Sequence, residues 1–255
     1  MAALTVITIT RDEERNIVEC LDSVRWADQL VVVDSGSTDR TVELARRFTS
    51  NVYSIEWEGY GHARNYALRH AAGDWILWLD ADERVPPDLA REIQDLVSRN
   101  DPVYSGYSVA RRAYFLGKWI KHCGWYPSRV VRLFRRNQGT FSETRVHERL
   151  ELQGTIGGLH HDLLHYTDPH LQQYLTKFNK YTTLAAQDMA SNGKPFRLLD
   201  LLIRPPFLFV KMYFLRLGFL DGVHGFVLCV LSSAYVFSKY AKLWELHRNV
   251  SQHND

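Results

Sequence analysis

The stretch GDWILWLDADE, residues 73–83, joins a short apolar run to a group of acidic residues. The run at 75–79 has the length and composition of a buried β-strand, and it ends directly at Asp80 and Asp82. In open α/β sheets, ligands bind outside the carboxyl ends of the strands. This stretch therefore predicts a strand of a mostly parallel sheet, with a functional site at its carboxyl end.

The chain before this stretch alternates in the same way. Short apolar runs predict strands at Leu4–Ile9, Leu30–Val33 and Val52–Ile55, and an amphipathic helix follows each of them. We expect Asp12 to cap the first helix, and Ser37 or Asp39 to cap the second. The alternation predicts an α/β fold, with a mostly parallel sheet and helices on both faces.

Beyond residue 100 the alternation becomes weaker. Tyr104–Phe115 and Arg129–Arg135 predict strands of an antiparallel extension. A helix is then expected to begin at Asp168 as its cap, with Pro169 in the first position, and to run towards Gly193.

The last sixty residues differ from the rest of the chain. Basic residues interrupt an aromatic and aliphatic stretch at 196–220, and the uncharged run at 225–238 is followed by Lys239 and Lys242. That run is shorter than the ~20 residues a spanning helix needs. It favours amphipathic helices in the membrane interface, with basic residues near lipid phosphates. The alternative is a helical pair that packs on the protein core.

Composition excludes some classes of protein. The 31 Lys and Arg nearly balance the 29 Asp and Glu, so the net charge of +2 predicts no nucleic-acid partner. Cys20, Cys123 and Cys229 are far apart and predict neither a disulfide framework nor a zinc site. Residues 4–15 lack the pattern of a signal peptide, so we expect the protein in the cytoplasm or on its membrane.

The acidic strand ends suggest a metal site. Two carboxylates with one residue between them can face one divalent cation, and Mg²⁺ and Mn²⁺ prefer such oxygen ligands. Asp80 and Asp82 are therefore candidate ligands, although an acidic turn or helix cap would have the same sequence. Two more strands end in polar residues, at Thr10 and at Asp34, and these too could serve only as parts of turns.

Three motifs carry a resemblance to a known family: VITITRDEERNI at 6–17, LVVVDSGSTDRT at 30–41 and GHARNYALRHAAGDWILWLDADE at 61–83. In their order and spacing they resemble glycosyltransferase family 2, inverting enzymes of the GT-A fold. The resemblance covers roughly the first hundred residues. It implies a nucleotide-sugar donor, and Mg²⁺ or Mn²⁺ as the cofactor. Ser35 departs from the family pattern, in which many members have a second Asp.

The resemblance also implies roles for single residues. It assigns nucleoside binding to Thr10, Glu13 and Asp34, donor binding to Arg64, Gly73 and Asp74, and the DxD motif to Asp80 and Asp82.

Later segments narrow the resemblance. YPSRVVRLFRR at 126–136, VHERL at 146–150, LLHYTD at 163–168 and GFLDG at 218–222 resemble the lipopolysaccharide inner-core glucosyltransferases of Gram-negative bacteria. Those enzymes act at the cytoplasmic face of the inner membrane. The resemblance implies glucose transfer from UDP-glucose to a lipid-linked core saccharide, by a protein that is peripheral or monotopic on that membrane.

Transfer with inversion needs a general base near the acceptor hydroxyl. Glu148 in the V-H-E segment resembles the base position of the family. We favour the base role over the alternative, a surface carboxylate paired with Arg145 or Arg149, and Glu143 and Asp162 are alternative bases.

His165 is a candidate third metal ligand, since a histidine completes the metal site in several GT-A enzymes. A packed or hydrogen-bonded histidine is the alternative, and it applies also to His147, His160 and His161. Arg132 is a candidate for binding the donor, and Arg129 and Arg136 could bind acidic groups in the same way. Trp119, Trp125 and Tyr126 suit either sugar stacking or core packing.

The motifs together predict a catalytic domain at 1–167, with a nucleotide-sugar half at 1–100 and an acceptor half at 101–167. A membrane-associating helical region is expected at 168–255. Three other functions stay open: a polyprenyl-phosphate sugar transferase, a sugar nucleotidyltransferase and a non-catalytic nucleotide-sugar-binding membrane protein. The Arg11–Arg15 stretch has no glycine, which speaks against the nucleotidyltransferase.

Overall fold

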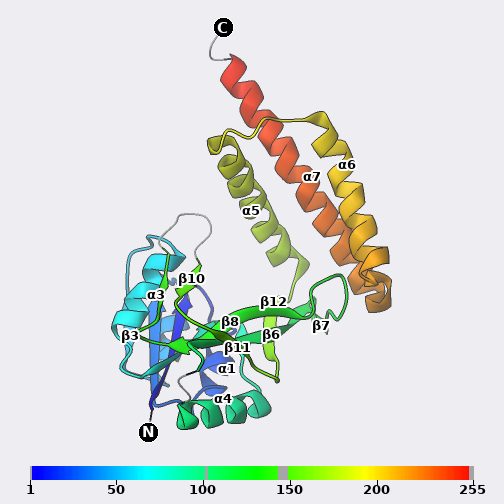
Figure 1. Ribbon diagram of the computed structural model, residues 1–255. Helices are drawn as coiled ribbons and strands as arrows, with labels where there is room; N and C mark the ends of the chain where they lie inside the picture. Colours follow the sequence, from blue (N-terminus) through cyan, green and yellow to red (C-terminus); the bar gives the residue numbers. More distant parts are fainter. Residues whose placement is uncertain (1, 101–102, 143–148, 253–255) are drawn as a thin grey trace. The chain divides into compact units, whose positions relative to one another are not determined.

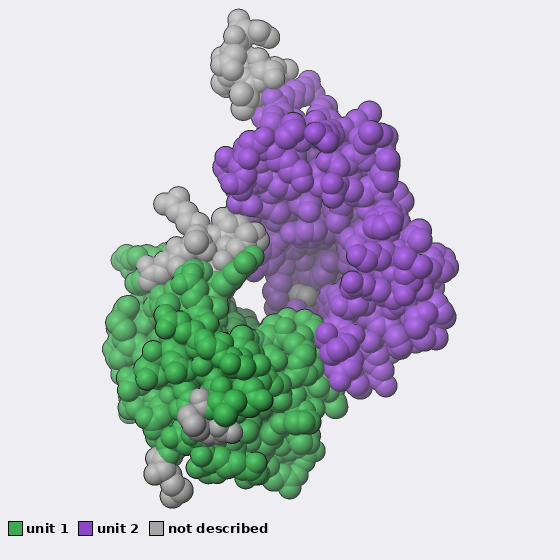
Figure 2. Space-filling model, viewed as in Figure 1, with its two compact units in different colours: residues 1–112, 128–165 green, residues 113–127, 166–255 purple. Residues whose placement is uncertain are grey.

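The computed structural model of the chain describes residues 2–100, 103–142 and 149–252 (Figure 1). The chain divides into two compact units, which Figure 2 colours separately. Residues 1–112 and 128–165 form the first unit, and residues 113–127 and 166–255 form the second. The predicted functional division between a catalytic domain ending at 167 and a membrane-associating region stays a prediction.

Within the described residues the main sheet is mixed and has ten strands, with the principal order β3-β2-β1-β4-β8-β6-β12-β5. Its parallel part consists of β1 (Leu4–Thr10), β2 (Gln29–Asp34), β3 (Val52–Ser54) and β4 (Trp75–Asp80). These are the four strands predicted from the apolar runs, each displaced by no more than one residue at either end. The α/β fold is therefore confirmed.

The antiparallel part follows β4 in the sheet. Its strands are β5 (Glu83–Arg84), β6 (Gly106–Phe115), β8 (Ser128–Arg135) and β12 (Leu163–Asp168). β8 pairs with β4 and β6, and β12 pairs with β5, all antiparallel. The shorter strands are β7 (Lys118–Trp119) and β11 (Ile156–Gly158), which pair with β6, and β9 (Gly139–Phe141) and β10 (Leu150–Leu152), which form a two-stranded sheet. The predicted antiparallel extension is thus confirmed.

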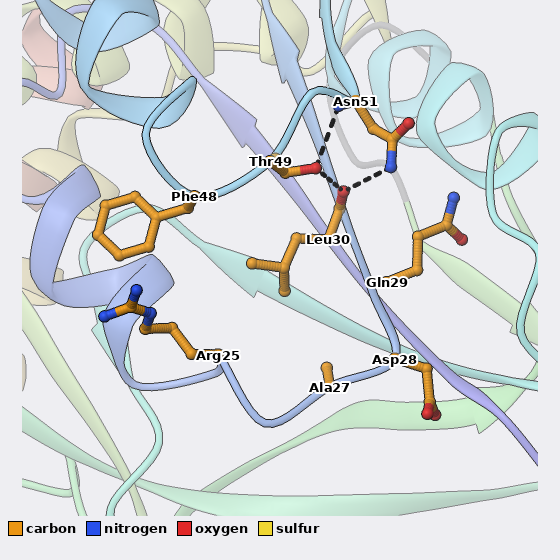
Figure 3. A pocket seen from close by; sticks show the side chains of 8 residues that line it. All are labelled: Arg25, Ala27, Asp28, Gln29, Leu30, Phe48, Thr49 and Asn51. Carbon is orange, nitrogen blue, oxygen red and sulfur yellow. Dashed lines mark hydrogen bonds between the residues drawn. The ribbon is translucent and has the colours of Figure 1, made fainter.

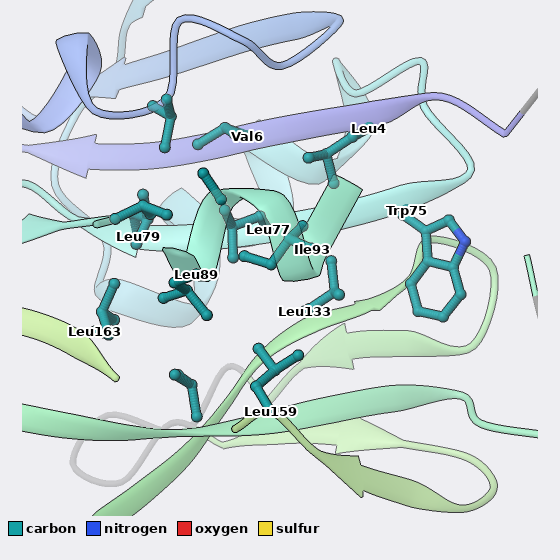
Figure 4. Close-up of a cluster of buried hydrophobic side chains, with 14 of the residues drawn as sticks. Leu4, Val6, Trp75, Leu77, Leu79, Leu89, Ile93, Leu133, Leu159 and Leu163 are labelled. Carbon is teal, nitrogen blue, oxygen red and sulfur yellow. The ribbon is translucent and has the colours of Figure 1, made fainter. Parts of the chain in front are cut away.

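Alternate strand residues point to opposite faces of the sheet, and the buried side chains divide accordingly. Val6 and Leu77 pack on one face against α1 (Ile17–Asp22) and α4 (Pro87–Arg99). Ile7 and Ile76 pack on the other face against α3 (Tyr60–Arg69). Helices therefore cover both faces (Figure 1), as predicted, and Figure 4 shows the cluster between the sheet and α4.

The sequence of α4 explains why this helix forms there. Pro87 occupies its first position, where a missing amide hydrogen costs nothing, and Asn100 ends it in the left-handed conformation with φ of 48°. Leu89, Ile93 and Val97 recur every four residues and are all buried. Burying one such side chain stabilises the fold by about 1.5–3 kcal/mol.

Two predicted helix starts are wrong. Asp12 does not cap α1, because Asn16 is the residue before that helix and Asp12 instead adopts φ of 54° in the preceding turn. Asp168 does not start a helix either, because β12 extends through Asp168 and the next helix begins at Leu171. In contrast, Asp39 does accept the amide hydrogen of Thr41, the first residue of α2 (Thr41–Ala45), at 2.9 Å.

The second unit is mainly helical. It contains α5 (Leu171–Ser191), α6 (Leu198–Val210), the single turns η1 (Lys211–Leu215) and η2 (Gly218–Asp221), and the long α7 (Gly222–Gln252). Both α5 and α6 pack along α7. Lys242 on α7 donates to the side chains of Asn179, Thr182 and Thr183 on α5, so the two helices are joined by polar contacts as well as by apolar ones.

Asp221 explains why residues 113–127 belong to this unit. Its buried carboxylate accepts the amide hydrogens of Lys121 and His122 at 3.3 and 2.8 Å, and Lys118 donates to its carbonyl oxygen at 2.8 Å. A buried carboxylate is costly unless it is hydrogen-bonded. The segment before β8 is thereby tied to the start of α7.

One continuous helical stretch of the described chain, Gly218–Arg248, which comprises η2 and most of α7, is long and apolar enough to cross a membrane by length and composition, with a mean hydropathy of 1.5 in an 18-residue window. The uncharged run at 225–238 is too short to span, but the helix continues well beyond it on both sides. Length and composition alone do not separate a spanning helix from the core helix of a soluble protein.

Replacing Gly73 by Ala should destabilise the first unit. A Cβ atom at this position would lie 2.7 Å from both the Ala3 carbonyl oxygen and the Thr5 amide nitrogen of β1. Overpacking of this kind costs about 1–3 kcal/mol, which urea unfolding would measure. Asp74→Ala is the matched control, since it removes one exposed hydrogen bond to Ala3. Equal stability of the Gly73 variant and the wild type would contradict the close approach.

Candidate active site

The carboxyl ends of three parallel strands meet at one edge of the sheet. Thr10 of β1 is level with Asp34 of β2, and Ile9 is level with Asp80 of β4. Adjacent strands lie about 4.8 Å apart, so the backbones of Asp34 and Asp80 are roughly 10 Å apart. The structure therefore brings the predicted strand ends together.

The pleat turns the side chains at these ends in different directions. Asp34 and Val32 are two residues apart on β2, so their side chains point to the same face of the sheet. On that face Val32 packs towards α1 and α2. Asp80 points to the same face as Ile76, four residues before it on β4, and Ile76 packs on α3. A ligand in contact with both carboxylates would have to lie across the end of the sheet, over Thr10.

The loops after β1 and β2 are bonded to each other. Asp12 donates its amide hydrogen to Ser37 Oγ at 2.8 Å, and its Oδ1 accepts the amide hydrogen of Thr38 at 2.7 Å. Glu13 donates its amide hydrogen to Thr41 Oγ1 at 2.8 Å. Each loop thus supplies hydrogen-bond acceptors for the other, and these bonds hold the two loops together beside Thr10.

Asp34 is buried inside its own turn. Its Oδ2 accepts the amide hydrogens of Gly36 and Ser37 at 3.1 and 3.0 Å, and its Oδ1 accepts the Ser37 hydroxyl. Gly36 has φ of 88°, a conformation that favours glycine. In this structure the carboxylate therefore holds the turn between β2 and α2. Glu13 lies in the facing loop, where its Oε2 accepts a hydrogen bond from Asn16 at 2.7 Å.

Asp80 is bonded to two arginines from different elements. Its Oδ1 accepts a hydrogen bond from Arg64 of α3 at 3.2 Å, and its Oδ2 accepts one from Arg132 of β8 at 2.6 Å. Burial raises the pKa of Asp80, but the charges of Arg132 and Arg64 outweigh that effect and hold the pKa at about 2. Asp80 is therefore ionised and neutralised by its neighbours.

Glu83 was not assigned a role from the sequence, yet it is a central residue of the site. It is fully buried, its Oε1 accepts a hydrogen bond from Arg132 at 2.6 Å, and its Oε2 accepts the amide hydrogen of Asp80 at 3.1 Å. Burial raises the pKa of Glu83, Arg132 opposes that rise, and the charge of Asp80 adds to it. Its position directly after the D-A-D triplet is the only sequence signal that pointed to it.

Trp78 is the second residue that the sequence did not single out. The guanidinium carbon atoms of Arg132 and Arg64 lie 3.6 and 4.3 Å from the centre of its ring. Its indole nitrogen donates to the carbonyl oxygen of Val131 at 2.8 Å. Cation–π contacts with a desolvated cation contribute about 2 kcal/mol, so Trp78 helps to retain both arginines beside Asp80.

Asp82 and His165 lie close together. The Nε2 atom of His165 on β12 is 3.4 Å from Asp82 Oδ2, and both side chains are partly exposed. Among the described residues no group of three or more acidic, histidine or cysteine side chains could hold a metal ion. Asp82 and His165 fit as two ligands of a Mg²⁺ or Mn²⁺ ion that would take its other ligands from water and donor phosphates. The oxygens of Asp80 are engaged by arginines instead.

Gly73 and Asp74 are not part of this arrangement. They precede β4, at the opposite edge of the sheet, roughly 20 Å along the strand from Asp80. Gly73 donates its amide hydrogen to Thr5 Oγ1, and Asp74 accepts that of Ala3. Both residues join the amino ends of β4 and β1, and their implied role near the donor stays a prediction.

Other candidates have structural partners or lie elsewhere. Arg129 donates to the carbonyl oxygens of Ser108 and Leu159 at 2.8 and 2.7 Å. Glu92 of α4 contacts the Nδ1 atoms of both His160 and His161. Asp162 forms an ion pair with Arg112. Arg136 is exposed. The three aromatic candidates belong to the second unit: Trp119, Trp125 and Tyr126. Glu143, Arg145, His147 and Glu148 lie outside the described residues, so the structure places neither the predicted base nor these alternatives.

A hollow of about 220 Å³ lies at the amino end of β2 (Figure 3). It is lined by Arg25, Ala27, Asp28, Gln29, Leu30, Phe48, Thr49 and Asn51. Thr49 and Asn51 donate to the carbonyl oxygen of Leu30 at 2.9 and 3.3 Å. Because β2 begins at Gln29, this hollow is at the opposite end of the strand from Asp34 and forms no part of the candidate site.

The chain shares its N-terminal pattern with a known family. Residues 5–157 match the sequence profile of glycosyl transferase family 2. The chain belongs to this family. Lipopolysaccharide core biosynthesis glycosyltransferase LpsC of Rhizobium meliloti is 30% identical to it over 251 residues, covering 96% of this chain and 93% of LpsC. An uncharacterized glycosyltransferase of Rickettsia typhi is 28% identical over 257 residues, covering 96% of this chain and 88% of that protein.

A solved structure with the same fold is the mannosyltransferase PcManGT from Pyrobaculum calidifontis, in complex with GDP-Man and Mn²⁺. The TM-score is 0.56 and the sequence identity 18%, covering 95% of this chain and 87% of PcManGT. The likeness supports the GT-A fold that the glycosyl transferase family 2 motifs imply.

Replacing Arg132 by Met should destabilise this family 2 chain strongly. It would leave the buried Glu83 without the guanidinium group that it shares with the partly exposed Asp80, and breaking such a pair costs about 3–5 kcal/mol in the free energy of unfolding. Urea unfolding measures the loss. Arg136→Gln is the matched control, because that exposed arginine should change stability by no more than about 0.5 kcal/mol.

The double variant Arg132→Met with Glu83→Leu distinguishes the contribution of Glu83 to this loss of stability from that of Asp80. Removing the buried Glu83 together with its cation should restore part of the lost stability. A double variant no more stable than the single one would show that Glu83 does not depend on Arg132.

Proposed function

We propose that this chain is an inverting glycosyltransferase that transfers a sugar from a nucleotide diphosphate to a hydroxyl group of a lipopolysaccharide core saccharide. Its place in glycosyl transferase family 2 and the full-length similarity to LpsC support the reaction class and the acceptor. The observation that carries the proposal is the meeting of Thr10, Asp34 and Asp80 at one sheet edge. UDP-glucose is the proposed donor.

The donor would lie across that edge. We assign its nucleoside to the two interlocked loops, next to Thr10, Glu13 and Asp34, and its diphosphate to the side of Asp82 and Arg132. Arginines that are held in a fixed orientation bind phosphate oxygens through charge-assisted hydrogen bonds. Arg64 and Arg132 are held in this way by Asp80 and by Trp78.

Breaking the bond between the sugar and the diphosphate places negative charge on the leaving group. A divalent cation held by Asp82 and His165 would supply a Lewis acid for that charge when bound. Arg132 adds fixed positive charge nearby, in surroundings from which water is largely excluded. Glu148 remains the proposed base that accepts the proton of the acceptor hydroxyl from the opposite side of the sugar.

The other functions are weaker. A sugar nucleotidyltransferase is disfavoured by the absence of glycine between Arg11 and Arg15. A non-catalytic binding protein would have no need of Asp80, Asp82 and Glu83 together at the carboxyl end of β4, where Glu83 is buried and Asp80 and Asp82 are partly exposed. A polyprenyl-phosphate acceptor remains the second candidate, because one helix meets the length of a spanning segment.

Substitution of Asp82 tests the reaction. We expect nucleotide-sugar hydrolysis or transfer to require Mg²⁺ or Mn²⁺ and to stop when a chelator is added. In Asp82→Asn the rate should fall by at least about 100-fold, because stabilisation of the transition-state charge of this kind contributes that much. A panel of UDP- and GDP-sugars identifies the donor. Asp95→Asn, an exposed position on α4, is the control that should keep full activity. Turnover indifferent to both chelator and Asp82 would reject the metal-dependent transferase.

We further propose that the C-terminal region associates with the cytoplasmic face of the bacterial inner membrane. Leu199, Leu215 and Val223 are 68, 72 and 75% exposed, and many other large apolar side chains of α6, η1, η2 and the start of α7 are exposed as well. Exposed apolar surfaces of this extent mark interaction sites. Arg204, Lys211 and Arg216 lie in the same stretch and suit anionic lipid headgroups.

Flotation with anionic liposomes tests this proposal on the full chain. The triple variant Leu199→Gln, Leu215→Gln and Val223→Gln should lose most of its binding, because each removed apolar contact weakens insertion. Gln172→Ala, Asn192→Ala and Ser251→Ala form a polar control triple. Release by alkaline carbonate would indicate an interfacial helix, and resistance a spanning one. Unchanged flotation of the apolar triple variant would refute membrane docking by this surface.

A further inference from the structure

Arg111 is a cation beside the candidate active site to which neither the motifs nor the proposed chemistry gives a role. It lies on β6, and its Nη1 atom is 3.9 Å from Glu83 Oε1. The same carboxylate oxygen accepts the 2.6 Å hydrogen bond from Arg132. Two guanidinium groups from neighbouring strands therefore converge on one buried oxygen.

Both arginines have buried nitrogen atoms without an acceptor among the residues that the structure describes. These atoms are Nε and Nη1 of Arg132 and Nε of Arg111. The Arg132 side chain is only 2% exposed, so bulk water does not satisfy it. Buried donors are nearly always hydrogen-bonded in native proteins, and exceptions need an explanation. These three atoms on two adjacent cations are donors that an anionic ligand could use.

The surroundings limit what that ligand can be. Glu83 is fully buried and is already used by Arg132 and by the amide of Asp80. Asp80 has its oxygens engaged by Arg64 and Arg132. The Arg111 side chain is still 23% exposed, which leaves an approach from solvent. A small anionic group entering beside Arg111 would meet both guanidinium groups.

We propose that Arg111 and Arg132, held in place by Glu83, form a receptor for an anionic oxygen of a phosphate or carboxylate group. The source of that group rests on the proposed function: it is either the diphosphate of the donor or an acidic substituent of the saccharide acceptor. Glu83 acts as a positioning residue, since both of its oxygens are already hydrogen-bonded within the protein and one of them orients Arg132.

Isothermal titration calorimetry of the full chain with inorganic phosphate, and separately with UDP, tests the receptor. Arg111→Gln should weaken phosphate binding by roughly tenfold or more, as expected for the loss of charge-assisted hydrogen bonds. Arg111→Lys keeps the charge but not the fork of donors, so it should recover part of the affinity. Arg136→Gln removes an exposed arginine beyond the end of β8 and should bind phosphate like the wild type.

The two titrations distinguish the sources. Weaker binding of both phosphate and UDP in Arg111→Gln would support the receptor and assign it to the donor diphosphate. Weaker phosphate binding with unchanged UDP binding would support it and assign it to the acceptor. A folded Arg111→Gln chain that binds phosphate as tightly as the wild type would overturn the proposal, and so would a folded wild type that binds no phosphate.

Failure of the transferase assignment would look different. A chain that binds phosphate through Arg111 but turns over no nucleotide-sugar would keep the receptor and reject the proposed function.

Discussion

The hydrogen bonds that Arg132 donates to Asp80 and Glu83 are the interaction on which the candidate site depends. One nitrogen of a fully buried guanidinium group serves both carboxylates, at 2.6 Å each. Taking three charges out of water is costly, and their mutual attraction offsets that cost only when the geometry is good. The result is a rigid junction that joins β8 to β4 and β5, although Arg132 lies 49 residues beyond Glu83 in the sequence. The DxD motif is therefore attached to the antiparallel half of the sheet as well as to its own strand.

Trp78 completes this junction. It stands two residues before Asp80 in β4, so the pleat places both side chains on the same face of the sheet. Its ring lies under the guanidinium groups of Arg64 and Arg132. An arginine whose guanidinium group stacks on a ring and pairs with a carboxylate is already held in one orientation. It therefore loses little further conformational freedom when it binds an anion. The apolar strand thus does more than fill the core, because one of its tryptophans orients the cations of the site.

The sequence predicted the parallel strands well because each is a short apolar run bounded by polar turns, and burial on both faces of the sheet demands that composition. It also placed Thr10, Asp34 and Asp80 at one edge, since parallel strands end together. The pairing of Glu83 with Arg132 and Arg111 could not be predicted, because it depends on contacts across 49 and 28 residues of sequence, which a local pattern does not encode. Gly73 and Asp74 belong to the family motif, but steric closeness to β1 explains them without a ligand.

Helix boundaries were harder to predict for a related reason. Asp12 has the side chain of a helix cap, but its carboxylate is used by Thr38 of a different loop. The uncharged run at 225–238 suggested a short interfacial helix, whereas α7 continues through Lys239 and Lys242 because Lys242 is accommodated by polar side chains of α5. In both cases a long-range polar partner decided the local structure.

The reciprocal bonds between the loops after β1 and β2 limit how this chain can vary. A shortened or substituted segment around Asp12 would remove the acceptor of the Thr38 amide and one of the two hydrogen bonds of the Ser37 hydroxyl, and a change around Ser37 would leave the Asp12 amide without that acceptor. The two segments should therefore be inherited as a matched pair. Anyone who wishes to exchange one of them between relatives would need to transplant both.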